Sequence, residues 1–258
     1  MNSVSPKAKI GTGVSIGPYT IIEDDVEIGN NVIIGSNVLI ANGARISDNV
    51  RIHHGAVLST NPQDLKFKGE HTILEVGAGT EIREYATLNR GTNYSGKTTV
   101  GGNCLIMAYA HIAHDCIVGN NVILANSVNM GGHVEIGDFA IIGGLVGIHQ
   151  FSKIGNYVII ASNSRVVKDI PPYVRAGNSP VKYEGIKVIG LNRNGFSKEK
   201  IALIQETYRI LYRSGLNITE GANKIKQSLE LTSEVNEILS FIERSERGLI
   251  SGKMILTG

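Results

Sequence analysis

The sequence predicts an all-β solenoid, a parallel β-helix of six-residue repeats, followed by a small helical domain. Aliphatic residues recur at every sixth position through most of residues 4–170. Six is a multiple of the strand period of two and does not match the helical period of 3.6. Past Gly190 the apolar spacing changes to three and four residues, which is typical of helices. Repeats of this length bury their apolar side chains by stacking each coil on the next.

The repeat occurs in three runs that keep the same phase, over residues 4–58, 76–88 and 100–166. Two positions before most of the aliphatic residues stands a small or β-branched residue, as Val122 stands before Leu124. In a strand, side chains two apart point to the same face and the residue between them points to the other. We therefore expect both of these positions to point inward.

Two polar segments, over about 59–73 and 89–98, interrupt the runs and are predicted to be loops that project from the solenoid. Insertions in solenoids often mark the binding face. The Pro- and Gly-rich segment 169–185 then closes the repeats. We expect the β-helix to occupy residues 1–190 and the helical domain residues 191–258.

Three helices are expected in the second domain. Ser197 caps the first, which ends near Gly215, and the others begin near Thr219 and Ser233. Their inward residues are predicted to be Ile201, Ile204, Tyr208 and Leu211 in the first, Ile225 and Leu229 in the second, and Val235, Ile238, Leu239 and Ile242 in the third.

Composition narrows the class of protein. The formal charge of the 258-residue chain is +2, which favours neither nucleic acid nor an anionic membrane as a partner. No run of 18 apolar residues predicts a membrane span, and the first residues show no signal peptide, so we expect a cytoplasmic protein. Cys104 and Cys116 are predicted to be small core residues on different sides of the solenoid and not a disulfide pair.

The sustained hexapeptide pattern resembles that of the left-handed β-helix acyltransferases. The resemblance implies triangular coils of three hexapeptides and a left hand, although crossover connections in general favour the right hand. With 18 residues in each coil, His114, His133 and His149 fall at one corner of three successive coils, and His111 lies beside it. Neighbouring coils are about 4.8 Å apart.

Three interpretations of this corner remain open. Its histidines are turn residues on a solvated edge, ligands of a metal ion such as zinc, or general bases. A neutral histidine can take a proton from a hydroxyl group that attacks an acyl carbon. The backbone N–H groups near Gly131 and Gly132 could hold the oxyanion that develops, since glycine permits close approach.

A narrower resemblance rests on longer motifs, which occur in the same order along nearly the whole chain: "NPQDLKFKGE", "EIREYATLNRGT", "AHIAHDC", "GGH", "FAIIGGLVGIHQF", "IPPYV", "GFS", "LYRSG" and "RSERGLI". Together they are similar to the UDP-N-acetylglucosamine O-acyltransferase family of lipid A synthesis. The resemblance implies transfer of a 3-hydroxyacyl group from acyl carrier protein to the sugar 3-hydroxyl, in a homotrimer with active sites between subunits. It implies no metal ion and no cofactor.

The same resemblance assigns roles to individual residues. His114 would be the general base, Asp115 its orienting partner and Gly132 the oxyanion donor. Successive strand residues face opposite ways, so a turn is needed to bring His114 and Asp115 together. The substrate-binding residues implied are Asp64, Lys66, His111, His133, His149 and Gln150 for the sugar and acyl groups, and Asn178 and Arg193 for the nucleotide phosphates.

The chain departs from the family pattern at a few positions. Asn89 and Asn194 stand where the family often has histidine and a second basic residue, so Lys182 or Lys187 could supply nucleotide contacts. Ser162 falls where the family limits acyl length, and the preferred chain length stays open. Seven basic residues against three acidic ones between residues 182 and 213 suit an acidic carrier protein, or form an ordinary solvated face.

Two other functions on the same scaffold are alternatives to O-acylation. One is a related N-acyltransferase, or an enzyme specific for a 3-amino sugar. The other is a zinc carbonic anhydrase. The identity of the acylated atom and the presence of stoichiometric zinc would separate these alternatives from the O-acyltransferase.

Overall fold

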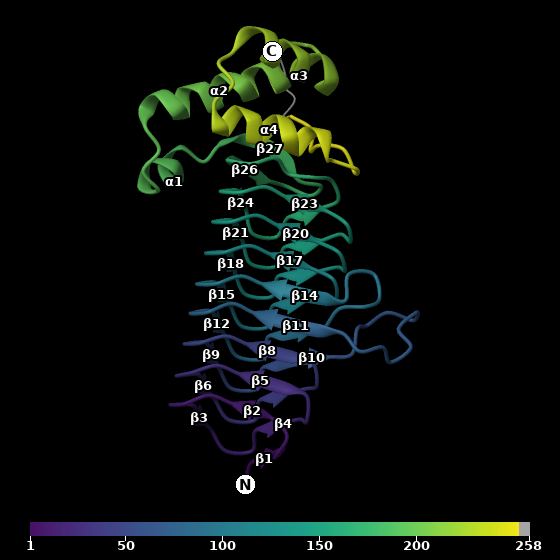
Figure 1. Cartoon of the computed structure of the whole chain (residues 1–258). Helices are drawn as coiled ribbons and strands as arrows, with labels where there is room; N and C mark the ends of the chain where they lie inside the picture. The colour runs from purple at the N-terminus through teal and green to yellow at the C-terminus, as the bar shows by residue number, and fades with distance from the viewer. Residues whose placement is uncertain (253–258) are drawn as a thin grey trace.

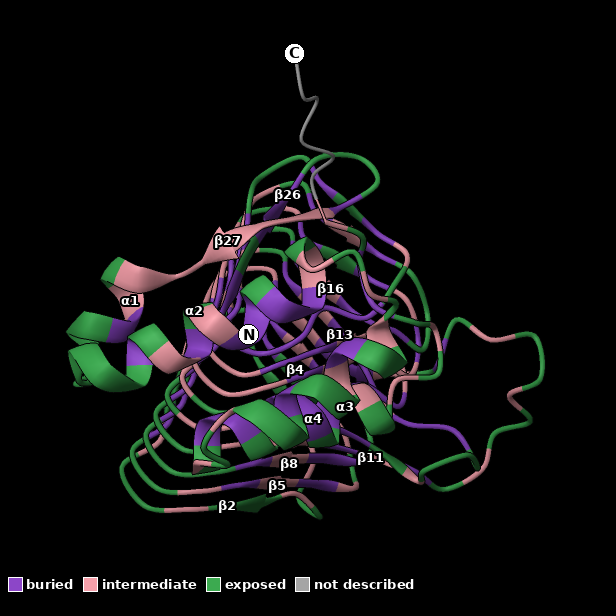
Figure 2. Ribbon diagram, turned by 90° about the horizontal axis from the view of Figure 1, so that it is seen from above, coloured by how far each residue is buried: buried purple, intermediate pink, exposed green. Residues whose placement is uncertain are grey.

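The computed structural model describes residues 1–252 as a three-sided parallel β-helix that carries helices at its C-terminal end (Figure 1). Figure 2, which looks along the solenoid, shows the triangular cross-section and the long loops that project from one corner. Each coil contributes one short strand to each of three sheets, A, B and C, in that order along the chain. Within the described residues, no helix is long and apolar enough to span a membrane.

The strands of all three sheets stack in parallel, except for the final strand of sheet C. Sheet A contains β1 (Ser3–Val4), β4 (Ile21–Ile22), β7 (Leu39–Ile40), β10 (Val57–Thr60), β13 (Thr87–Asn89), β16 (His111–Ile112), β19 (Asn129–Met130), β22 (Gly147–Ile148) and β25 (Arg165–Val166). Sheet B contains β2 (Lys9–Ile10), β5 (Val26–Ile28), β8 (Ala44–Ile46), β11 (Ile73–Val76), β14 (Lys97–Val100), β17 (Ile117–Val118), β20 (Glu135–Ile136) and β23 (Lys153–Ile154). Sheet C contains β3 (Ser15–Ile16), β6 (Ile33–Ile34), β9 (Arg51–Ile52), β12 (Glu81–Ile82), β15 (Leu105–Ile106), β18 (Ile123–Leu124), β21 (Ile141–Ile142), β24 (Ile159–Ile160), β26 (Val174–Gly177) and the antiparallel β27 (Lys182–Ile186).

The register confirms the predicted stacking of 18 residues per coil. Ile112 pairs with Met130, and Met130 pairs with Ile148. The aliphatic positions are buried along the solenoid, but Val4 and Ile10 are each 37% exposed because no coil lies beneath the first one. Cys104 and Cys116 are buried free thiols, as predicted.

Both inserted loops leave the solenoid at the corner between sheets A and B, here called the A–B corner. Residues 61–72 join β10 to β11, and residues 90–96 join β13 to β14. The corresponding core positions Leu58 and Val76 are 18 residues apart, and Leu88 and Val100 are 12 apart, where an uninterrupted repeat needs six. The insertions are therefore outgrowths of one corner in two successive coils, and the coils above continue in phase.

The helices match the predicted pattern with one addition. They are α1 (Val188–Arg193), α2 (Lys198–Arg213), α3 (Ile218–Ser228) and α4 (Ser233–Glu243). The Ser197 side chain caps α2 as predicted, by accepting a hydrogen bond from the Lys200 N–H. The second helix is capped by Asn217, so it begins slightly earlier than expected. The short α1 was not predicted, because only Leu191 in it is buried and six residues carry no readable period.

Candidate active site

His114 and Asp115 form a hydrogen-bonded dyad at the A–B corner. They occupy the turn between β16 and β17, and the Asp115 backbone is in the left-handed region with φ of 58°. This conformation breaks the alternation of a strand, so the two neighbouring side chains meet. The distance from His114 Nδ1 to Asp115 Oδ2 is 2.7 Å, and the Asp115 side chain is fully buried. The turn that the predicted dyad requires is therefore present.

The second inserted loop folds over Asp115. Oδ1 accepts hydrogen bonds from the N–H groups of Thr92 and Ser95 and lies 2.5 Å from the Ser95 hydroxyl oxygen. Oδ2 accepts a hydrogen bond from the Thr92 hydroxyl at 2.7 Å, besides the one from His114. Burial acts to raise the pKa of Asp115, but the hydrogen bonds from His114, Ser95 and Thr92 outweigh it and hold that pKa well below its usual range. The carboxyl group is therefore ionised at neutral pH.

Gly132 lies against the His114 ring, one coil above it. A Cβ atom at Gly132 would be 2.5 Å from His114 Cε1 and 2.7 Å from Nε2, so only glycine leaves room for the imidazole. Among the hydrogen bonds of the described residues, none uses the Gly132 N–H. A backbone donor is thus available beside the ring of the candidate base.

His133 stands above Asp115 and belongs to an aromatic cluster. Its ring stacks on Phe151 with centroids 4.2 Å apart and meets the edge of Tyr94 at 4.4 Å. His133 Nδ1 is 3.9 Å from Asp115 Oδ2 and is a buried nitrogen without a hydrogen-bond partner among the described residues. Burial lowers the pKa of His133, partly offset by the Asp115 charge.

The inserted loops and this cluster enclose a groove of about 750 Å³. Its lining includes Asp64, Lys66 and His133 together with Tyr94 and Phe151. The Asp64 carboxylate accepts a hydrogen bond from the Lys66 N–H at 3.0 Å, which fixes the local turn of the first loop. The structure therefore brings Asp64 and Lys66 to the histidine corner, although the sequence places them 48 or more residues away from His114.

The remaining corner residues lie on or beside the outer face of sheet A. His111 Nδ1 is 2.7 Å from the Thr87 hydroxyl, and burial, with the nearby His114, lowers the pKa of His111. His149 and Gln150 follow β22 two coils above His114 and are exposed, with His149 Nδ1 3.1 Å from the Gln150 carbonyl oxygen. All four histidines are gathered on this side of the solenoid, as the 18-residue spacing predicts.

Asn178 and Arg193 lie elsewhere in the chain. Asn178 follows β26 of sheet C, where its Nδ2 donates a hydrogen bond to Glu184. Arg193 is the exposed last residue of α1, which Figures 1 and 2 show on the side of the solenoid away from the loops. Within one chain, these two residues are not part of the histidine corner.

The residues that depart from the family pattern lie at several places in the fold. Asn89 is buried beneath the loops, where its Nδ2 donates to Thr60 and Asn61. Asn194 donates to the Gly190 carbonyl, and Lys187 is half-buried, which lowers its pKa. Ser162 is exposed in the turn that follows β24 of sheet C.

The dyad and His133 do not fit a metal site. Ligand-type atoms of His114, Asp115 and His133 lie within 4.8 Å of one another. However, the Asp115 oxygens already receive five hydrogen bonds, whereas a carboxylate offers about four lone-pair sites. No Asp115 lone pair is left for a cation, so Asp115 does not complete a three-ligand site with His114 and His133.

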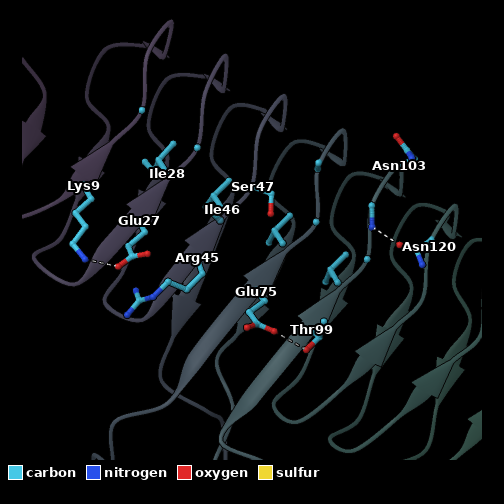
Figure 3. A pocket seen from close by; sticks show the side chains of 18 of the residues that line it. Lys9, Glu27, Ile28, Arg45, Ile46, Ser47, Glu75, Thr99, Asn103 and Asn120 are labelled. Atoms are coloured by element: carbon cyan, nitrogen blue, oxygen red, sulfur yellow. Dashed lines mark hydrogen bonds and ion pairs between the residues drawn. The ribbon is translucent and has the colours of Figure 1, made fainter.

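A second groove, of about 940 Å³, runs along sheet B at the N-terminal half of the solenoid (Figure 3). Its charged side chains are paired: Lys9 Nζ lies 2.8 Å from Glu27, and Arg45 contacts Asp25 at 2.7 Å. Glu75 likewise pairs with Lys97. These mutual pairs make the groove an exposed ladder of salt bridges, distinct from the histidine corner.

Sequence reasoning missed the residues that complete the corner, namely Thr92, Tyr94, Ser95 and Phe151. Loop 90–96 carries several hydroxyl groups, and polar side chains of this kind are common in any loop. Nothing in a sequence pattern says that this loop folds back over the turn of the next coil. Phe151 follows Gln150 directly and occupies the same turn position as Asp115 and His133, so the repeat itself could have indicated it.

Comparisons with known proteins identify the family. A family model described as "Udp N-acetylglucosamine O-acyltransferase; Domain 2" matches residues 169–250, and one for bacterial transferase hexapeptide repeats matches residues 7–42 and 97–132. A protein from Sulfurihydrogenibium named acyl-[acyl-carrier-protein]–UDP-N-acetylglucosamine O-acyltransferase is 56% identical over 95% of this chain and 91% of its own. One of the same name from Chlorobaculum parvum is 53% identical over 96% of this chain and 97% of its own.

Solved structures agree. The UDP-N-acetylglucosamine acyltransferase from Bacteroides fragilis is 45% identical, covers 96% of this chain and 98% of its own, and superposes with a TM-score of 0.94. The enzyme of this type from Acinetobacter baumannii is 41% identical, covers 96% of this chain and 97% of its own, and has the same TM-score. The solenoid is accordingly a left-handed parallel β-helix. The chain belongs to the acyl-[acyl-carrier-protein]–UDP-N-acetylglucosamine O-acyltransferase family.

Proposed function

We propose that this protein transfers a 3-hydroxyacyl group from acyl carrier protein to the 3-hydroxyl of UDP-N-acetylglucosamine, the first step of lipid A biosynthesis, with His114 as the general base. The relatives at 56% and 53% identity carry the name of this reaction. The single observation that supports the mechanism is the His114–Asp115 dyad beside the Gly132 N–H. General-base catalysis needs this combination of an oriented imidazole and a nearby oxyanion donor.

The dyad orients the imidazole for proton transfer. Because the Asp115 carboxylate is ionised, the Nδ1–H of His114 donates to it, and Nε2 is left without a proton. Nε2 takes the proton of the sugar hydroxyl as the oxygen attacks the thioester carbonyl carbon. The carbon–sulfur bond then breaks, and the imidazolium returns the proton to the leaving thiolate of the carrier. The Gly132 N–H donates to the oxyanion between these steps.

The groove at the A–B corner suits a sugar and an acyl chain. Asp64 and Lys66 supply polar groups on one wall, while Tyr94 and Phe151 supply an apolar surface beside His133. His111, His149 and Gln150 extend the polar lining along sheet A. Pockets that combine an apolar wall with a few polar groups are typical of small-molecule sites.

The nucleotide contacts assigned to Asn178 and Arg193 require a second subunit, because these residues lie away from the dyad of their own chain. A homotrimer with sites between subunits would meet this need. Large apolar side chains are exposed at both corners involved: Leu65 and Tyr94 at the A–B corner, and Tyr109 and Leu145 at the corner that follows sheet C. Such surface is usually covered by a partner. We place this assembly in the cytoplasm.

The carrier protein is proposed to dock on the basic segment 182–213. Not every cation there is available, since Arg209 pairs with Glu206 and Lys200 pairs with Glu234. Arg213 remains beside a groove of about 490 Å³ between β27 and α2. An acidic carrier would be steered to this face, and its association rate would fall with salt.

Turnover of UDP-N-acetylglucosamine with several 3-hydroxyacyl carrier proteins tests the function. His114→Ala should lower kcat roughly 10²-fold or more, as expected for removal of a general base. A product resistant to mild base would indicate an amide and an amine acceptor. Wild-type turnover by His114→Ala would overturn the mechanism.

Mixing two inactive variants tests the shared site. His114→Ala and Arg193→Ala chains, unfolded and refolded together in equal amounts, should regain about a quarter of wild-type activity, because random assembly leaves that share of interfaces with both residues intact. Each variant refolded alone is the control. No recovery in the mixture, with trimers present, would contradict a site between subunits.

A further inference from the structure

We infer that Thr92 and Ser95, on the inserted loop 90–96, are positioning residues for the reaction, because their hydroxyl groups fix the ionised Asp115 carboxylate in line with His114 Nδ1. The inference rests on the proposed function of the dyad. The loop then has two roles, since it lines the groove and also positions the dyad.

The contacts divide between the two carboxylate oxygens. The Thr92 hydroxyl donates to Oδ2, the same oxygen that accepts from His114, at 2.7 Å. The Ser95 hydroxyl oxygen lies 2.5 Å from Oδ1 and 2.8 Å from the Lys97 carbonyl oxygen. Its single proton goes to Asp115, because an ionised carboxylate is the stronger acceptor and the distance is shorter. Each oxygen is thus held by one hydroxyl group as well as by its other donors.

The backbone of Asp115 is held by the same part of the chain. Its N–H donates to the hydroxyl oxygen of Thr98 at 2.8 Å, and Thr98 is fully buried in β14. Thr92, Ser95 and Thr98 follow at intervals of three residues, and the hydroxyl group of each is hydrogen-bonded to Asp115. The left-handed conformation of Asp115 recurs at the turns of the other coils, so it belongs to the repeat, and the hydroxyl groups fix the side chain that this turn presents.

The arrangement explains why a buried carboxylate here stays charged. Burial alone would favour the neutral acid, which would donate a proton to His114 Nδ1 instead of accepting one. The imidazole would then carry its proton on Nε2, the atom that must be free to act as a base. The hydroxyl groups of the loop therefore set the tautomer of His114 through Asp115.

Thr92→Val and Ser95→Ala test the inference, because both variants keep the backbone N–H donors and remove only a hydroxyl group. Each should lower kcat roughly tenfold, since a hydrogen bond to a charged group is lost, and leave KM within about twofold. Thr92→Ser should restore kcat. In nitrogen-15 NMR of the substrate-free protein, His114 should be the Nδ1–H tautomer in the wild type and a mixture in the double variant.

Thr80→Val is the matched control. The buried Thr80 hydroxyl bonds to Gly101 and the Cys104 N–H, far from the dyad, so its loss should lower stability similarly and leave kcat and the His114 tautomer unchanged. Wild-type kcat and an unchanged tautomer in the Thr92 and Ser95 variants, with His114→Ala inactive, would overturn the positioning role alone. Full turnover by His114→Ala would instead overturn the proposed function.

Discussion

His114 Nδ1 lies 2.7 Å from Asp115 Oδ2 although the two residues are neighbours in the chain. Adjacent residues of a strand point to opposite faces, so this contact exists only because both belong to a corner turn. The same turn position in the next coils holds His133 and Phe151, with φ of 61° and 62°. The dyad and the aromatic cluster above it therefore share one backbone geometry, repeated coil after coil.

Asp115→Asn should lower kcat roughly 10²–10⁴-fold with a smaller effect on KM. The amide can donate a hydrogen bond to His114 Nδ1 and so favours the tautomer with the proton on Nε2. Steady-state kinetics at neutral pH measures the loss. Activity within twofold of wild type would mean that Asp115 does not orient the base.

Gly132→Ala should lower kcat roughly 10²-fold, because the new methyl group would lie 2.5 Å from His114 Cε1 and displace the ring. Gly144→Ala is the control, since its Cβ would meet only the Asn126 carbonyl oxygen, at 3.2 Å. Crystal structures of both variants would show whether the imidazole moves. An unmoved ring with full activity in Gly132→Ala would contradict the close packing described here.

Protein stability should fall as the pH drops below about 7. Burial lowers the folded-state pKa of His133 and of His111 below the unfolded value of about 6.5. The unfolded chain therefore binds these protons first, and a contribution that is complete above pH 7 is lost as the pH falls through the folded-state values. Urea midpoints of His133→Asn between pH 5 and 8 should vary less steeply than those of the wild type. Equal slopes would exclude this linkage.

Ile112→Ala should reduce the free energy of unfolding by about 2–5 kcal/mol, because its fully buried side chain is enclosed by coils on both sides. Ile10→Ala, at the same repeat position in the uncovered first coil, should cost less than about 1 kcal/mol. Denaturant midpoints at equal protein concentration compare the two. Similar losses of unfolding free energy in the two variants would show that the coil below each aliphatic residue contributes little to stability.

The six-residue period was sufficient to predict a solenoid of short strands and its inward positions. The 18-residue coil that the family resemblance implies then predicted the register and the gathering of the histidines, because one side-chain position repeats with every coil. The role of Asp115 came from the family resemblance, and the alternation of strand residues indicated only that a turn is needed to bring it to His114. The period could not give the path of residues 61–72 and 90–96, since their contacts with Asp115 and His133 depend on loop conformation and not on periodicity. For the same reason, Asp64 was linked to the site through family resemblance alone.

The separation of Asn178 and Arg193 from the dyad also could not be predicted from the repeat pattern. Their position in the chain depends on which corner of the triangle each strand precedes. The sequence pattern specifies this corner for regular coils but not for the closing hairpin of β26 and β27.

Because both insertions begin and end at a single corner, the strands before and after each insertion keep their parallel pairing within sheets A and B. Loop length is therefore uncoupled from the stacking of the scaffold. Segment 61–72 could be shortened or exchanged for that of another family member to alter substrate preference, while the three sheets keep their alignment. The architecture in this way separates the part of the chain that must be regular from the part that is free to diversify.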